Sequence, residues 1–160
     1  MDQEKTYSVM VGEEPLVFKT GKIAKQANGA VIISHGDTVL LCTACMNDTV
    51  RTGIDFFPLV VDYEERYYAA GKIPGGFVKR EGKPSDSGIL GSRVIDRSIR
   101  SLFDDNMRNE VQIVTTVLAM DQMYPANVLG INGASAALAI SGIPWNGPVA
   151  AVRIGLVGGN

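Results

Sequence analysis

The 160-residue chain has little of several residue types that define whole classes of protein. It contains two cysteines, one histidine and one tryptophan, and its formal net charge is only −2. Two cysteines are too few for a disulfide framework, and no histidine cluster accompanies them to complete a metal site. The small net charge excludes the bulk electrostatic attraction of a wholly basic nucleic-acid binder, so any such contact must come from local clustering of charge.

Long apolar runs are also absent from the sequence. Glycine and polar residues interrupt each apolar stretch well before the roughly 18 residues that suggest a membrane-spanning helix. The first residues, 1–5, are mostly polar or charged and do not resemble a secretion signal. We therefore expect a cytoplasmic protein with no membrane partner.

The cysteines and the histidine favour structural roles. Cys42 and Cys45 lie in a run that predicts a strand, where residues three apart point to opposite faces, so we expect two buried thiols rather than a metal or redox pair. His35 stands in a Ser-His-Gly-Asp sequence typical of a hairpin turn. Since no nucleophile lies near it in sequence, we expect a turn role for His35 rather than a catalytic one.

The pattern along the chain predicts one α+β (mixed α/β) domain, with a mixed sheet packed with helices. We expect strands over residues 7–11, 16–20, 30–34, 38–46, 56–63, 110–120 and 149–157, and helices over residues 85–103 and 127–141. The apolar stretch 57–61 suggests a strand buried on both faces. A natural domain seldom stops at a strand running into a turn, so we expect a fragment, or a fold that another segment or subunit completes.

The two predicted helices differ in character. At about 100° per residue, the first helix separates a cationic face from an apolar face that is expected to pack. The cationic face holds Arg93, Arg97 and Arg100, and the apolar face holds Leu90, Val94, Ile95, Ile99 and Leu102. The second helix has many small side chains and almost no charge, which indicates a buried helix, and its Ser135 is expected to bond to its own backbone.

Positive charge concentrates in the long irregular segment 69–84 and in the helix that follows it. Seven of the fifteen Lys and Arg residues are Lys72, Lys79, Arg80, Lys83, Arg93, Arg97 and Arg100. Guanidinium groups match phosphate oxygens, and Phe77 beside them offers a base a stacking surface. Residue types alone leave two interpretations open: a surface that binds RNA or phosphate, and a solvated face partly neutralised by Glu81, Asp86 and Asp96.

Three long runs carry a resemblance to a known family: Phe56 to Gly82, Ile95 to Phe103 and Gly133 to Pro144. They closely resemble the first ribonuclease PH-type core of polynucleotide phosphorylases, and the similarity runs nearly end to end. The resemblance implies a ribosomal protein S5 domain 2-like fold. It makes residues 1–160 an incomplete first core, truncated at its C-terminal end, with the second core and the C-terminal RNA-binding modules absent.

The same resemblance implies an activity and partners. The family forms homotrimeric rings around a channel for single-stranded RNA, which it degrades from the 3' end by phosphate attack, reversibly, releasing nucleoside diphosphates. An enzyme with this reaction is a polyribonucleotide nucleotidyltransferase, and the family acts in mRNA degradation. Proteins of RNA-degradation complexes are implied as further partners. Mg²⁺ or Mn²⁺ and inorganic phosphate are implied as cofactor and co-substrate, and the metal ligands lie in the second core, outside this chain.

The resemblance also implies which residues contact RNA. The family's Phe-Phe-Arg-Arg loop, which constricts the channel, corresponds to Phe77, Val78, Lys79 and Arg80. In this sequence Val78 replaces the second phenylalanine, which removes an aromatic ring face. Lys79 replaces the first arginine, so a compact ammonium charge stands in place of a planar guanidinium. Lys83, Arg93, Arg97 and Arg100 complete the expected RNA-binding set, and Lys72 and Arg153 are further candidates, although an arginine on a strand equally fits an ion pair.

We expect no catalytic residue in this portion of the protein. Single-core relatives place a Gly-Gly-Thr-Arg-like loop before the second helix, whereas residues 123–130 contain no Thr-Arg pair. Asp62 and Glu64 share a strand face, but the neighbouring Glu65 and Arg66 favour an exposed, self-compensated strand end. We therefore expect an isolated chain that is inactive and contributes RNA binding and ring assembly. The alternative is a non-catalytic RNA-binding ring subunit.

Overall fold

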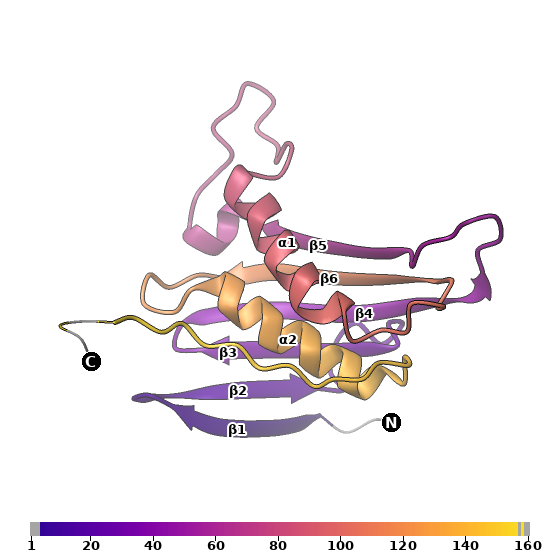
Figure 1. Cartoon of the computed structure of the whole chain (residues 1–160). Coiled ribbons are helices and arrows are strands. Elements are labelled where there is room, and N and C mark those ends of the chain that lie inside the picture. The colour runs from indigo at the N-terminus through magenta and orange to yellow at the C-terminus, as the bar shows by residue number, and fades with distance from the viewer. Residues whose placement is uncertain (1–3, 157, 159–160) are drawn as a thin grey trace.

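The computed structural model describes residues 4–156 and 158, and its centre is one six-stranded sheet of order β1-β2-β3-β4-β6-β5. Two helices, α1 and α2, cover one face of this sheet (Figure 1). The strands are β1 Lys5–Val11, β2 Glu14–Thr20, β3 Gly29–His35, β4 Thr38–Val50, β5 Leu59–Glu65 and β6 Asn109–Ala119. The helices are α1 Asp86–Arg100 and α2 Ala126–Ser141, and a 3-10 turn, η1, spans Tyr67–Ala70. The predicted α+β arrangement is confirmed, and the order of its elements is as predicted as far as α2.

Alternating burial along β3 and β4 places the core between the sheet and the helices. Val31 and Ile33 of β3 and Leu40 and Cys42 of β4 are buried, while the residues between them are half-buried. The two strands form the predicted hairpin, with Gly36 at φ +55° in its turn. This alternation is the period of a strand with one face against a hydrophobic core. No helix in the described part of the chain is long and apolar enough to cross a membrane.

Helix α2 lies very close to the sheet because small residues face it. A Cβ atom at Gly133 would overlap Cys42 Sγ and would lie 2.9 Å from Ile33 Cγ2. Gly130 lies equally close to Ile95 of α1, at 2.9 Å from its Cδ1 to the position of a Cβ. The absence of side chains at these positions lets α2 contact both β4 and α1, which confirms the predicted buried helix.

Helix α1 begins as predicted, but its packed face is narrower than expected. The Ser85 side chain caps it by accepting a hydrogen bond from the Gly88 N–H at 3.0 Å. Ile95 and Ile99 are buried, whereas Leu90 is 62% and Val94 47% exposed. The predicted packing of Leu90 and Val94 is therefore wrong. Helix α1 packs mainly against β5 and α2, so a single stripe of small and branched residues forms most of its packed face.

Two strand predictions also differ from the structure. Strand β5 begins at Leu59 and is the last strand of the sheet, parallel to β6, so Val60 is 42% exposed and the expected burial on both faces is wrong. Residues 149–156 are not a strand; Val157 of that prediction lies outside the described residues. Side chains of α2 bond this segment instead: the Val149 N–H donates to Ser135 Oγ at 2.9 Å. The expected bond of Ser135 to its own helix backbone is therefore wrong: its hydroxyl accepts from the segment that follows the helix.

We predict that Gly133→Ala lowers the free energy of unfolding by about 1–3 kcal/mol, the usual cost of overpacking a core. The new methyl group would overlap the Cys42 sulfur, and this outweighs the better helix propensity of alanine. Urea unfolding followed by circular dichroism measures the change.

Cys42→Ala in the Gly133→Ala background removes the overlapping sulfur and should recover part of the loss. Gly82→Ala is the matched control, because nothing lies within 4 Å of a Cβ there and its φ is not positive. An unchanged stability of Gly133→Ala would show that α2 is not held at this distance.

Candidate nucleic-acid interface

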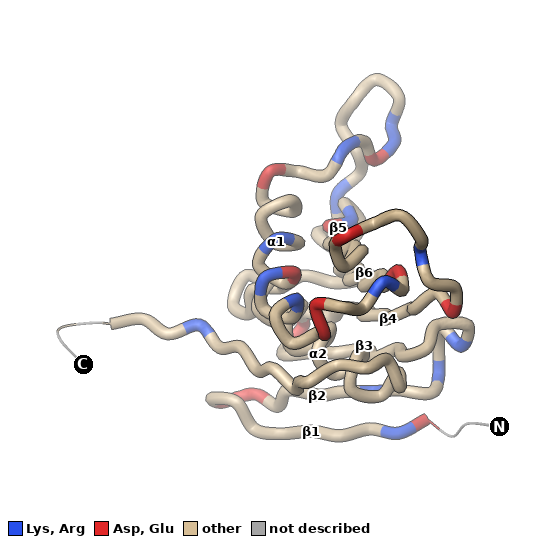
Figure 2. The backbone as a smooth tube through the Cα atoms, turned by 45° about the vertical axis from the view of Figure 1, so that its right-hand side comes forward, with Lys and Arg blue, Asp and Glu red and all other residues tan. Residues whose placement is uncertain are grey.

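The predicted long loop leaves the body of the fold between η1 and α1 (Figure 1). Its apolar side chains face outward: Ile73 is 81% exposed and Phe77 is fully exposed. Lys79 has φ +52°, a left-handed conformation that a lysine rarely adopts. The tip 77–80 therefore presents an aromatic ring beside two cationic side chains to the solvent. Figure 2 shows positive charge along this projecting loop.

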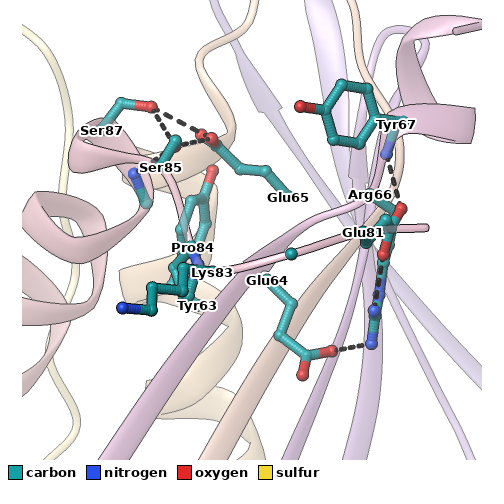
Figure 3. Close-up of a pocket in the computed structure, with 12 residues that line it drawn as sticks. Tyr63, Glu64, Glu65, Arg66, Tyr67, Glu81, Lys83, Pro84, Ser85 and Ser87 are labelled. Atoms are coloured by element: carbon teal, nitrogen blue, oxygen red, sulfur yellow. Dashed lines mark hydrogen bonds and ion pairs between the residues drawn. The ribbon is translucent and has the colours of Figure 1, made fainter. Parts of the chain in front are cut away.

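The loop is closed at its neck by Glu81. One oxygen of its carboxylate accepts from Arg66 Nη1 at 2.7 Å, and the other accepts from the Tyr67 N–H at 2.9 Å (Figure 3). These hydrogen bonds hold the pKa of Glu81 below its usual value, and the bond from Arg66 has the larger effect. Arg66 also forms an ion pair with Glu64 of β5. Glu81 thus pairs with an arginine of the sheet end and does not serve only to neutralise the surface.

A second carboxylate holds the point where the loop enters α1. Glu65 Oε2 accepts from Ser85 Oγ at 2.9 Å and from Ser87 Oγ at 3.0 Å (Figure 3). Between the neck and the start of α1 lies a cavity of about 500 Å³, lined in part by Tyr63 and Lys83. The sequence reasoning missed the roles of Glu65 and Glu81, because their partners are 14 to 22 residues away and no local pattern links them.

The three arginines of α1 lie around one shallow hollow of about 280 Å³ together with Asp96. Arg93 and Arg97 are exposed, and neither forms an ion pair within the part of the chain that the structure describes. Arg100 differs, since its guanidinium donates to both carboxylate oxygens of Asp96. It also donates to the carbonyl of Leu59 at 3.1 Å and to that of Phe57 at 3.4 Å. Four of its five N–H donors are therefore already used, two by Asp96 and two by backbone carbonyls at the start of β5.

The remaining candidates separate into two places. Lys72 and Lys83 are exposed on the two sides of the loop, one before and one after the tip. Arg153 is exposed on the C-terminal segment and lines a different cavity of about 740 Å³, between β1, β2 and α2. Figure 2 shows that segment extending away from the loop. Arg153 is therefore not part of the surface formed by the loop and α1.

Cys42 and His35 have structural roles, but two details of the prediction are wrong: Cys45 is only half-buried, and His35 belongs to β3 and not to the turn. Cys42 is buried, which raises the pKa of its thiol to about 12, and Cys45 is half-buried on the opposite face of β4; both are free thiols. The His35 ring stacks on Tyr124 with centroids 3.9 Å apart, and its Nε2 lies 3.2 Å from the Val11 carbonyl oxygen. His35 thus packs at the end of β3 rather than within the turn. Residues 4–156 and 158 contain no group of three potential metal ligands.

The acidic side chains Asp62 and Glu64 of β5 accept hydrogen bonds from their neighbours. Gln112 of β6 donates to Asp62 at 3.1 Å, and Thr116 of β6 donates to Glu64 at 3.2 Å. Glu64 also pairs with Arg66. The expected compensation therefore applies to Glu64, through Arg66, whereas Asp62 receives one neutral hydrogen bond. Both residues are half-buried, so the expected exposure is wrong.

Comparisons with known proteins agree with the resemblance. Residues 13–144 match the family described as "3' exoribonuclease family, domain 1". Polyribonucleotide nucleotidyltransferases of Moorella thermoacetica and Borrelia hermsii are 57% and 54% identical over 150 residues, which is 94% of this chain. The chain spans about one fifth of the length of these relatives, 20% and 21%.

Two solved structures share the fold at low sequence identity. Rice (Oryza sativa) Rrp46 aligns with a TM-score of 0.60 at 15% identity, over 91% of this chain and 58% of that one. The Archaeoglobus fulgidus exosome with RNA bound to the active site aligns with a TM-score of 0.53 at 18% identity, over 86% and 50%. Together with the family match, these structures confirm the predicted ribonuclease PH-like fold.

We predict that Arg100→Ala lowers the free energy of unfolding by about 1–2 kcal/mol, because it removes hydrogen bonds that join α1 to the start of β5. Arg97→Ala, three residues earlier on the same helix, has none of these bonds and should change stability by at most about 0.5 kcal/mol. Urea unfolding of both variants measures the difference. Equal losses of stability in the two variants would mean that the hydrogen bonds of Arg100 do not stabilise the fold.

Proposed function

Because the chain belongs to the 3' exoribonuclease family, through the first domain of that family, we propose that it is the RNA-contacting portion of a polyribonucleotide nucleotidyltransferase. In this proposal the whole protein degrades RNA from its 3' end with inorganic phosphate and releases nucleoside diphosphates, reversibly, in cytoplasmic mRNA degradation. Residues 1–160 supply part of the first core, and the second core and RNA-binding modules belong to the rest of the protein. The short coverage of the relatives supports this division.

One observation carries the assignment of RNA contact to this portion. Seven of the fifteen cationic residues lie between positions 72 and 100, on one projecting loop and one exposed helix face, in a chain whose net charge is −2. Such local clustering attracts a phosphodiester backbone even when the whole protein does not. The fully exposed Phe77 adds a surface on which a base can stack.

We assign different roles to the members of this surface. Lys79 and Arg80 at the tip bind phosphate groups of a single strand, Phe77 stacks on a base, and Val78 supplies an apolar contact without a ring face. Lys72 and Lys83 extend the positive charge along the sides of the loop. Arg93 and Arg97 continue it along α1. Arg100 contributes less to RNA, because most of its donors are already used within the fold.

No catalytic role is assigned to this portion. The described residues contain no cluster that fits a divalent metal, and the carboxylates of β5 are bonded to neighbouring side chains. The proposal therefore places no Mg²⁺ or Mn²⁺ ligand and no group that activates phosphate in this chain. The cofactor and the co-substrate belong with the second core. On its own the chain binds RNA without cutting it.

Ring assembly completes the proposal. We propose that the protein works as a homotrimer, in which loops of three copies approach a common path for single-stranded RNA, with proteins of RNA-degradation complexes as further partners. The fold shared with a solved exosome supports a ring. The outward position of the loop supports its approach to such a path.

We predict that Lys79→Ala combined with Arg80→Ala weakens binding of a fluorescein-labelled 20-nucleotide adenylate RNA. The logarithm of the RNA-binding constant falls linearly with the logarithm of the salt concentration. Each lost phosphate contact on a single strand makes this fall less steep by about 0.7, so two lost contacts reduce the steepness by about 1.4. Fluorescence anisotropy across a salt series measures both affinity and slope.

The matched control is Lys5→Ala combined with Lys25→Ala, which removes the same charge at exposed positions outside the surface. The control should keep nearly the full slope. Equal losses in both variants would reduce the effect to net charge and contradict a localised RNA surface.

Phosphate added to the same samples should release no nucleoside diphosphate. Release by the purified chain would place catalytic groups within it and overturn the division proposed above.

A further inference from the structure

We propose that Glu81 is a positioning residue for RNA binding, which closes the neck of the loop 67–81 and thereby holds the cationic tip in its binding orientation. The inference rests on the proposed function, since it assumes that the tip contacts RNA. It assigns to an acidic residue, adjacent to two RNA-binding cations, a role that favours binding.

The tip has little of its own to hold it. Ile73, Phe77 and Val78 are largely exposed, so no buried side chain anchors this part of the loop. Among the described residues, the one backbone hydrogen bond within segment 73–80 joins the Lys79 N–H to the Gly76 carbonyl at 3.0 Å. The orientation of the tip therefore depends on how the two ends of the loop are fixed.

The first end is fixed to the sheet. The Met120 N–H, just after β6, donates to the Ala69 carbonyl at 3.1 Å, and the Lys72 N–H donates back to the Tyr67 carbonyl at 3.0 Å. Gly71 then turns the chain outward with φ +65°. These bonds hold η1 against β6 and set the direction in which the loop leaves.

Glu81 fixes the second end to the first. Its carboxylate joins Arg66 and the Tyr67 N–H, which lie 15 and 14 residues earlier in the chain. Arg66 is in turn paired with Glu64, which accepts a hydrogen bond from Thr116 of β6. A continuous series of bonds therefore runs from the sheet to Glu81, and Figure 3 shows the part from Glu64 through Arg66 to Glu81. Charge-assisted bonds of this kind are stronger than neutral ones.

The bond of Glu65 to Ser85 and Ser87 cannot replace this closure. It holds the start of α1, four residues beyond Glu81, and leaves residues 82–84 between itself and the neck. Without Glu81 the free part of the loop would extend from Lys72 to Pro84. A longer free segment samples more conformations, so binding would lose more entropy when the tip is ordered on RNA.

Simple electrostatics makes the opposite prediction, which allows a sharp test. Glu81 follows Arg80 directly, so its negative charge repels the phosphates that Lys79 and Arg80 bind. If Glu81 is only a surface charge, its neutralisation strengthens RNA binding. If Glu81 positions the tip, its neutralisation weakens binding although the local charge becomes more favourable.

The experiment compares Glu81→Gln with the wild-type chain, using the fluorescein-labelled adenylate 20-mer at one salt concentration. We expect the Kd to rise about three- to tenfold, because the tip must be ordered during binding. Glu81→Asp keeps the charge but shortens the side chain, and we expect it to weaken binding as well. Asp86→Asn is the control, with the same change of charge at a carboxylate that has no hydrogen bond or ion pair among the described residues. It should leave the Kd unchanged or lower it.

Limited trypsin digestion reports on the loop without RNA. Cleavage after Lys79 and Arg80 should be several-fold faster in Glu81→Asp, which keeps a negative charge beside the cleaved bonds, as well as in Glu81→Gln. The thermal midpoints of both variants should stay at the wild-type value, and Asp86→Asn should be cleaved at the wild-type rate. If the wild-type chain binds RNA and Glu81→Gln binds equally well or more tightly, the positioning role of Glu81 is wrong, while the proposed RNA contact stands. Absence of wild-type RNA binding overturns the proposed function itself, and the digestion then shows separately whether Glu81 closes the loop.

Discussion

The close approach of α2 to the sheet is the constraint on which the other parts depend. Gly133 above Cys42 and Gly130 beside Ile95 let one helix contact β4 and α1 at the same time. Because α1 is held from α2 on one side and from β5 on the other, its rotation is set, and its arginines face outward. A larger residue in α2 would displace α1, and with it the cationic face and the end of the loop.

The edge of the sheet provides the second fixed point. Strand β5 is the last strand, so its end at Glu65 is free of a further neighbour and its side chains can reach the loop. Glu65 and Arg66 lie next to each other at this end and hold two different parts of the returning chain. Arg100 joins α1 to the beginning of the same strand. One strand edge thus positions both the loop and the helix that carry the positive charge.

Charge is used in two ways within this small region. Arg66 is paired with the carboxylates of Glu64 and Glu81, and it maintains the structure. Arg100 does the same by pairing with Asp96 and donating to two backbone carbonyls. Lys79, Arg80, Arg93 and Arg97 have no ion pair among the described residues and are the cations available to a phosphate backbone. The two interpretations of the cluster that the residue types left open therefore apply to different members of it.

Local patterns in the sequence determined the types and order of the elements as far as α2, the irregular loop and the concentration of cations in it. These features depend on residues a few positions apart, where periodicity and turn chemistry act directly. Only the tertiary structure decided that Leu90 and Val94 are exposed, that β5 is an edge strand, that Ser135 bonds residue 149, and that Glu81 meets Arg66. Each of these depends on which distant element lies alongside. A sequence pattern can predict the apolar face of a helix or the position of a charged side chain. It does not identify the distant residue that the fold places against that face or charge.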